Sequence, residues 1–283
     1  MNKKVKAIVI SSVAVISVLG IATGVFFGMF PMNPKVEIKS ADERLNNKDR
    51  ILVASYNTAS PWGSFIEGTY TTRRANLFAQ QINNVLPDVL GVQELNSIWQ
   101  GKMKELLPQY DYYGVKRGGD EKEETSEMSG IFYLKDKFEL VDSGNFWLSE
   151  TPDTPSWGWD TACPRIVTYA ILKDKTTNFV YAHFNTHFDH VGKVAQSESV
   201  PLLASRIAAI APDIPVVLTG DFNVSEGSEI YNKLVLCGLK DTKFMAEKHD
   251  NCATYHDYNP FVFNTKPIDY IFTNAYCSSV KTS

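Results

Sequence analysis

Hydrophobic and polar positions over residues 50–283 form two kinds of pattern. Short apolar runs bounded by turn residues predict buried strands, and apolar residues three and four apart predict amphipathic helices. Strands are expected at 51–56, 89–92, 131–134, 166–172, 179–184, 215–218 and 268–272. Helices are expected at 73–86, 194–211 and 228–236. Strands and helices alternate loosely, and some strands are adjacent, which favours an α/β domain with a mixed sheet.

The first thirty residues have a different pattern. Three lysines precede an uncharged run of 24 residues, which as a helix would span the ~30 Å hydrocarbon core of a bilayer. We predict a cytoplasmic stub at 1–6, a transmembrane signal anchor at 7–30 and a linker at 31–49. The lysines favour an N-terminus left inside, so the catalytic domain at 50–283 would lie outside the cytoplasm, held at the membrane. The alternative is a long cleaved signal peptide and a secreted domain.

Composition narrows the class of protein. Hydrophobic residues make up 44% of the chain and charged residues 21%, as in an ordinary folded domain. Beyond the three N-terminal lysines, 25 basic and 32 acidic residues remain, a formal charge of −7. This charge lacks the broad basic footprint of a tight nucleic-acid binder, although a local basic groove stays possible. The four cysteines, Cys163, Cys237, Cys252 and Cys277, could pair in three ways in an exported domain or stay free.

Polar residues suited to metal or phosphate binding stand where the expected strands end. They are Asn57, Glu94, His187, Asp221 and Asn223, with Asp269 inside the last apolar run. One such residue is more often a turn former or a solvated rim residue. Several in one chain indicate a site, because α/β folds gather their sites at strand ends.

These residue types match the needs of phosphoester hydrolysis. Mg²⁺ prefers oxygen ligands, and Glu94 can supply a carboxylate with Asn57 as a supporting amide. Asp221 can orient and deprotonate the attacking water. Donors for the phosphate oxygens are available from Asn223, Arg165 and His187. The set predicts a hydrolase that depends on Mg²⁺ or Mn²⁺.

Six stretches occur in the order known from one family. They are SYNTAS (55–60), DVLGVQELNS (88–97), FWLSETPDTPSWGWDTACPRIVTYA (146–170), NTHFDHVGKVAQSES (185–199), LTGDFN (218–223) and PIDYIFTN (267–274). Through them the chain resembles the endonuclease/exonuclease/phosphatase superfamily, which includes deoxyribonuclease I, and most closely an uncharacterised, mainly bacterial branch. The resemblance implies two mixed β-sheets packed as a sandwich with helices on both outer faces.

The resemblance also implies roles for single residues. Asn57 and Glu94 correspond to the metal-side pair, with Glu94 the direct ligand. The catalytic positions correspond to His187, Asp221 and Asp269. The substrate-binding positions correspond to Arg165 and Asn223. We expect Asp189 and His190 to support the site or shape a turn.

The chain departs from the family in one place. The family has a Ser-Asp-His segment downstream of the strand at 268–272, and the residues up to Ser283 contain none. We therefore expect a domain that lacks its C-terminal strand, through truncation or as a variant with impaired activity. His249 and His256 both precede Asp269, and His256 is interpreted as a loop residue.

Three functions are consistent with these patterns. The first is a divalent-metal-dependent phosphodiesterase or phosphatase, and the second is its more specific form, an ecto-nuclease. The third is a catalytically silent domain that binds a phosphorylated or protein partner. The substrate class stays open among nucleic acid, lipid headgroup and small phosphate ester, because one catalytic set serves all of them in this superfamily.

Two loops carry further expectations. Residues 116–129 are charged and contain glycine, which predicts an exposed loop. Phe146 and Trp147 adjoin a strand and are expected to pack. Trp157 and Trp159 either pack or stack on bases or lipid headgroups.

Overall fold

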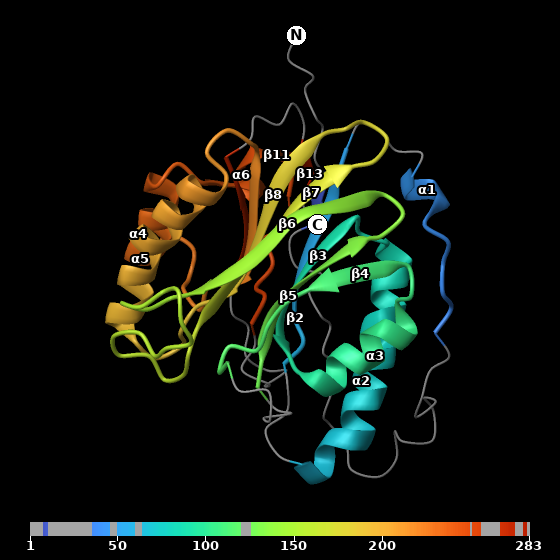
Figure 1. Cartoon of the computed structure of the whole chain (residues 1–283), viewed down its shortest axis with the longest axis horizontal. Helices are drawn as coiled ribbons and strands as arrows, with labels where there is room; N and C mark the ends of the chain where they lie inside the picture. Colours follow the sequence, from blue (N-terminus) through green and yellow to red (C-terminus); the bar gives the residue numbers. More distant parts are fainter. Residues whose placement is uncertain are drawn as a thin grey trace.

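Two β-sheets lie face to face with helices on both outer sides (Figure 1). The computed structural model describes residues 8–10, 36–45, 50–59, 64–119, 126–249, 251–255, 267–274 and 280–281. The first sheet has the order β1 (Ile8–Ile10), β2 (Leu52–Asn57), β3 (Val89–Leu95), β5 (Met128–Leu134), β4 (Tyr110–Tyr113). The second has the order β10 (Lys240–Asp241), β12 (Asp269–Thr273), β9 (Val216–Asp221), β8 (Val180–His187), β7 (Ile166–Asp174), β6 (Phe138–Trp147).

Both sheets are mixed, as expected. The pairs β1–β2, β2–β3 and β8–β9 are parallel, and the other neighbours in the two sheets are antiparallel. The short strands β11 (Ala246–Lys248) and β13 (Val280–Lys281) pair with each other. The helices are α1 (Asp42–Leu45), α2 (Ser64–Val85), α3 (Ser97–Leu106), α4 (Lys193–Ile210), α5 (Glu229–Leu236) and α6 (Thr242–Met245). Helices α2 and α3 cover the first sheet, and α4 and α5 cover the second (Figure 1).

Three buried apolar clusters hold the layers together. One lies between the sheets and joins Val53 and Val89 to Leu172 and Ile271. The other two lie between each sheet and its helices, for example around Phe78 of α2. Alternate strand residues point to opposite faces, so each sheet buries side chains on both faces. Each large apolar side chain buried in this way contributes about 1.5–3 kcal/mol.

The sheets also meet through buried polar side chains. Asn185 of β8 donates to the carbonyls of Val92 (3.0 Å) and Gly130 (2.8 Å) in the first sheet. Its Oδ1 accepts from Gln93 Nε2 at 2.7 Å and from Thr219 Oγ1 at 3.0 Å. A Cβ atom on Gly91 would overlap Thr219 and Asn185, so only glycine fits this close approach. We call Gln93, Asn185 and Thr219 the amide cluster. Its hydrogen bonds connect the two sheets and fix their relative position beneath the polar strand ends.

The structure does not support the predicted transmembrane helix at 7–30 in the few of its residues that it describes. Ile8–Ile10 form strand β1, with Ile8 opposite Leu52 of β2. An apolar run fits a buried strand as well as a helix, and β-branched residues favour the strand. The rest of the run at 7–30 lies outside the described residues. In the described part of the chain, no helix is both long and apolar enough to cross a bilayer.

Two smaller expectations are also settled. Phe146 and Trp147 are buried, as predicted, whereas Trp157 is 64% exposed. Among the described cysteines, Cys163, Cys237 and Cys252 are free thiols, and Cys277 lies outside the described residues.

Candidate active site

The polar residues predicted at strand ends converge on one edge of the sandwich. Asn57 ends β2 and lies opposite Gln93 of the parallel neighbour β3. In the second sheet, His187 lies opposite Asp221, and Asp221 lies opposite Asp269. Three adjacent strands therefore place three titratable side chains in one row across the sheet.

Glu94 reaches this edge through an irregularity in β3. The register with β5 shifts between Val92 and Leu95, and Glu94 has a φ of 56°. A left-handed backbone at a non-glycine residue is uncommon and strained, and bulges re-aim side chains beside functional sites. The bulge turns the carboxylate of Glu94 toward the second sheet.

Asn57 joins the two sheets at the site. Its Nδ2 donates to Glu94 Oε1 at 2.9 Å and to Asp221 Oδ2 at 3.0 Å. Its Oδ1 accepts from the backbone N–H of Ala59 at 2.7 Å. The amide nitrogen of Asn57 therefore holds the two carboxylates close to each other. Residues 164 positions apart thus share one hydrogen-bonded group.

The carboxylate of Asp221 is poised to exchange a proton near neutral pH. Burial raises the pKa of Asp221 to about 6, while the hydrogen bonds from Asn57 and the backbone of Asn223 lower it. Burial, followed by the charge of Asp221, raises the pKa of Asp269 well above its ordinary value. A base that orients and deprotonates water works best with a pKa near the operating pH.

His187 is held in a defined tautomer by Asn223. Asn223 Nδ2 lies 3.0 Å from His187 Nε2 and donates to the carbonyl of Phe188 at 3.0 Å. The carbonyl can only accept, which fixes the orientation of the amide, so Nε2 also accepts and the ring proton lies on Nδ1. Burial lowers the pKa of His187 well below its ordinary value, and Arg165 lowers it further. The ring is neutral, and both amide protons of Asn223 are used within the protein.

Arg165 is fixed by the two residues expected to support the site. Its Nε donates to Asp189 Oδ2 at 3.2 Å, and its Nη2 lies 2.9 Å from His190 Nδ1. Asp189 also accepts from the backbone N–H groups of Val191 and Gly192, so it shapes the turn before α4. Arg165 is 3% exposed, and its Nη1 has no hydrogen-bond partner among the described residues.

Two residues of this region escaped the sequence analysis. The exposed loop predicted at 116–129 is wrong at its end, where Glu127 is buried and lines a small pocket beside Glu94 and His187. Arg117 lines the same pocket and pairs with Glu127 at 2.6 Å. One signal in the sequence could have identified Glu127. It lies directly before β5, and the other site residues also lie at the ends of strands.

The structure places Asp269 without a histidine partner in the part that it describes. Its backbone N–H donates to Thr254 Oγ1 at 3.2 Å, and the Thr254 hydroxyl also bonds to its carboxylate. His249 is exposed and lies beside Phe244, and His256 falls outside the described residues. The described residues contain no group of three or more histidines, cysteines and carboxylates suited to a metal.

Known structures share this architecture. The mannosyl-6-phosphatase of Bacteroides thetaiotaomicron is 36% identical, with a TM-score of 0.74 over 81% of this chain and 87% of that chain. An endonuclease/exonuclease/phosphatase of Bacteroides vulgatus is 32% identical, with a TM-score of 0.73 over 81% and 89%.

Sequence comparison agrees with the structural likeness. Protein L388 of Acanthamoeba polyphaga mimivirus is 30% identical over 187 residues, which are 60% of this chain and 63% of that protein. The chain thus spans less than two thirds of this viral relative. The sequence pattern of the Endonuclease/Exonuclease/phosphatase family matches residues 54–282. This chain belongs to the endonuclease/exonuclease/phosphatase family.

Proposed function

We propose that this chain is a divalent-metal-dependent hydrolase of phosphoester bonds. The observation that carries the proposal is the bridge from Asn57 to Glu94 and Asp221, which brings two carboxylates from different sheets to one amide. Neutral His187 and the guanidinium of Arg165 lie beside them. Carboxylates for metal and water next to donors for an anion are the set that phosphoester hydrolysis requires.

The donor set fits Mg²⁺ or Mn²⁺. Both ions take oxygen ligands, and Mg²⁺ is commonly held by one or two carboxylates and several waters. Glu94 would hold the ion and Asn57 would keep Glu94 in place. A site with one carboxylate and several waters does not need the group of three histidines, cysteines or carboxylates that the described residues lack. When bound, the ion stabilises negative charge on the phosphate oxygens.

Asp221 would act on the attacking water. Its Oδ2 faces Asn57 at 3.0 Å and its Oδ1 accepts from the Asn223 backbone at 2.9 Å, so the carboxylate is held still. With a pKa of about 6 it is ionised at neutral pH and accepts a proton readily. Asp269 lies next to it in register, and burial, followed by the charge of Asp221, raises the pKa of Asp269 well above its ordinary value.

His187 and Arg165 would bind the phosphate oxygens. His187 Nδ1 carries a proton and has no hydrogen-bond partner among the described residues. Arg165 Nη1 likewise has no partner among them. Asn223 would act mainly by fixing the tautomer of His187, because both of its amide protons are already donated. Contact between Asn223 and the phosphate would require one of those bonds to open.

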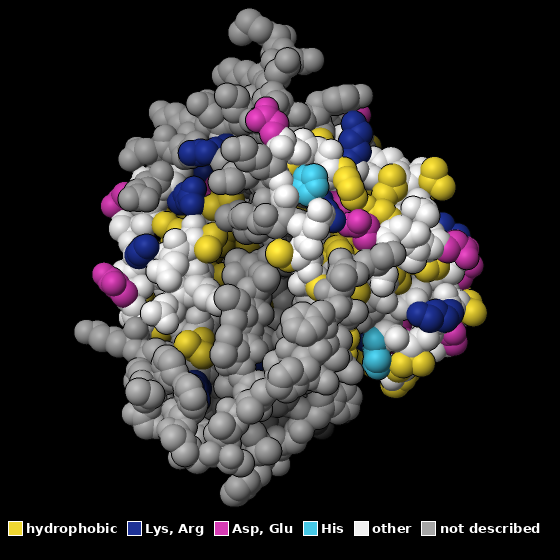
Figure 2. All heavy atoms as spheres, turned by 180° about the vertical axis from the view of Figure 1, so that it is seen from behind, with side chains coloured by type: hydrophobic (Ala, Val, Ile, Leu, Met, Phe, Trp, Pro, Cys, Tyr) yellow, Lys and Arg dark blue, Asp and Glu magenta, His cyan; other side chains and the backbone are white. Residues whose placement is uncertain are grey.

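The substrate is a phosphate ester, and two observations bear on its kind. The mannosyl-6-phosphatase of Bacteroides thetaiotaomicron supports a small phosphate ester. On the face shown in Figure 2, the basic and acidic side chains of the described residues are interspersed, and this together with the charge of −7 gives the ecto-nuclease alternative less support. The location of the domain outside the cytoplasm stays a prediction from the apolar run at 7–30.

The test is hydrolysis by the full chain with Mg²⁺, Mn²⁺ or EDTA. The substrates are p-nitrophenyl phosphate, bis-p-nitrophenyl phosphate, plasmid DNA, RNA and sphingomyelin. Glu94→Ala should abolish turnover of every substrate, whereas Glu139→Ala, which removes an exposed carboxylate from β6, should not. Turnover that survives EDTA or Glu94→Ala would refute the proposal. A folded chain that turns over nothing would favour the silent binding domain.

A further inference from the structure

A wide groove adjoins the candidate active site beside the second sheet. Its volume is about 710 Å³, within the usual range of sites that bind small molecules. The first turns of α4 form one wall, the start of α5 forms another, and the segment after β9 joins them. The groove is open at the surface, so a ligand can reach it from solvent.

Asn223 connects the groove to the active site. It lines the groove, and its Nδ2 lies 3.0 Å from Nε2 of His187. The carbonyl of Asn223 accepts from Gln196 Nε2 at 3.3 Å, and the same Nε2 donates to the carbonyl of Asp189 at 2.6 Å. Gln196 lines the groove as well and is 1% exposed. The groove therefore begins one residue away from the proposed phosphate site, on a part of the fold that is held in place.

The two helices are joined across the groove. Lys233 Nζ of α5 donates to Ser197 Oγ of α4 at 2.6 Å and pairs with Glu229 Oε1 at 3.2 Å. A serine hydroxyl that accepts one bond can still donate another, and a carboxylate accepts several. Ser197 and Glu229 therefore present a donor and acceptors from opposite walls to a molecule in the groove.

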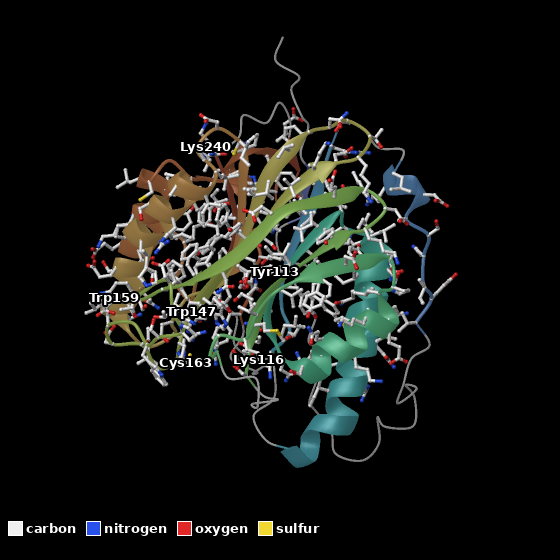
Figure 3. All side chains as sticks on the ribbon, viewed as in Figure 1. Tyr113, Lys116, Trp147, Trp159, Cys163 and Lys240 are labelled. Atoms are coloured by element: carbon white, nitrogen blue, oxygen red, sulfur yellow. The ribbon has the colours of Figure 1, made fainter. Side chains whose placement is uncertain are left out.

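The start of α4 is fixed by the loop before β7. The carboxylate of Asp160 accepts from the backbone N–H groups of Val194 at 3.2 Å and Ala195 at 2.7 Å. Trp159, the residue before Asp160, lies beside the lower end of the helix pair α4 and α5 in Figure 3. The wall that α4 contributes is therefore formed without a ligand, which reduces the entropy lost on binding.

The lining favours one class of ligand. Among the described residues that line the groove, one is basic and two are acidic, so they form no basic track for the phosphates of a nucleic acid. Three are apolar, which is few for a site that would hold an acyl chain. The other five carry hydroxyl or amide groups: Gln196, Ser197, Asn223, Ser225 and Ser228. Such groups suit a neutral molecule that donates and accepts hydrogen bonds at many points.

We propose that this groove binds the alcohol part of the substrate, and that this alcohol is rich in hydroxyl groups, as a sugar or an open-chain polyol is. The inference rests on the proposed phosphoesterase function and names the substrate class. With the phosphate at His187 and Arg165, the alcohol passes Asn223 and reaches Ser197 and Glu229. Each hydrogen bond to a substrate hydroxyl strengthens binding by about 2- to 12-fold.

The first test compares esters of similar size in the full chain with Mg²⁺. Glucose 6-phosphate and sorbitol 6-phosphate carry hydroxyl groups, whereas cyclohexylmethyl phosphate has a ring and a primary ester without them. We expect kcat/KM for at least one hydroxyl-rich ester to exceed that for cyclohexylmethyl phosphate by about 10-fold or more. The better of the two separates a ring sugar from an open chain. Equal values, or faster turnover of cyclohexylmethyl phosphate, would overturn the proposal.

Two variants locate the preference in the groove. Ser197→Ala should lower kcat/KM for the preferred ester about 2- to 12-fold and leave cyclohexylmethyl phosphate unchanged, while Lys233 keeps its pair with Glu229. Ser225→Trp fills the groove and should lower kcat/KM for the preferred ester by about 10-fold or more. Methyl phosphate is too small to enter the groove and should keep its value, which also shows that the variant is folded.

The matched control is Ser205→Ala. Ser205 is an exposed serine of the same helix, it does not line the groove, and its loss should leave every ester unchanged. A preference for hydroxyl-rich esters that survives Ser225→Trp would refute the assignment of the groove.

A binding measurement separates this inference from the proposed function. Titration calorimetry of Glu94→Ala in EDTA, with the same three esters, requires no turnover. Suppose that the natural chain hydrolyses nothing, but a hydroxyl-rich ester binds more tightly than cyclohexylmethyl phosphate and Ser225→Trp removes the difference. The groove then stands and the hydrolase falls. Hydrolysis without such a preference in binding or turnover would leave the hydrolase standing and refute the groove.

Discussion

Two polar regions connect the sheets of this sandwich, and they are built in opposite ways. In the amide cluster, neutral Asn185 satisfies both of its amide protons and accepts two further bonds. At the edge, Asn57 draws the carboxylates of Glu94 and Asp221 together, and donors of His187 and Arg165 lack partners among the described residues. The amide cluster is neutral, and within it Gln93 Oε1 lacks a partner among the described residues, whereas the edge concentrates charged groups at a cost in stability.

The sharpest test of this difference is Asp221→Asn. The loss of the base should lower kcat about 10²- to 10⁴-fold, because that is the usual contribution of general base catalysis. The protein should remain folded, because the side chain keeps its size and its Oδ1 still accepts from the backbone of Asn223, although the new amide nitrogen loses the bond from Asn57. Steady-state kinetics with circular dichroism checks both; activity near that of the natural chain would remove Asp221 from the mechanism.

The counterpart inside the sandwich is Asn185→Leu. It removes four hydrogen bonds, two of them to the carbonyls of Val92 and Gly130, so we expect a loss of about 3 kcal/mol or more in the free energy of unfolding. Denaturant unfolding measures it. Thr168→Val is the matched control, because the buried hydroxyl of Thr168 has no partner among the described residues, and its loss should cost little. Similar losses in the two variants would contradict the role given to the amide cluster.

The smallest expected effect is a pH-dependent gain in stability from Asp221→Asn. The folded pKa of Asp221, about 6, lies above its unfolded value of 3.8, so the aspartate favours folding less as pH rises between these values. In EDTA, the stability of the variant relative to the natural chain should rise by about 1–3 kcal/mol between pH 4 and pH 8. Urea unfolding across this range measures the gain. A gain that is the same at both pH values would show that the charge of Asp221 is not its cause.

Local sequence predicted most of the elements of the fold. Each of the seven expected strands and three expected helices has a counterpart, for example β9 at Val216–Asp221 for the run at 215–218. Helix α3 escaped because its buried side is narrow, with Trp99 and Met103 its buried residues. Strand β6 escaped because its middle is polar and at the edge of its sheet. The family resemblance supplied the two-sheet arrangement, which apolar periodicity alone does not contain.

What the sequence by itself determined is the type and chain position of the site residues, because a strand end is a local property of the apolar pattern. Tertiary structure alone decided that Arg117 and Glu127 join the site, that Asn223 donates to His187 and to the carbonyl of Phe188, and that Asp221 has a pKa near 6. The physical reason is distance along the chain. Burial, pairing and charge depend on which remote strands pack together, and no local pattern encodes the approach of Asn57 to Asp221.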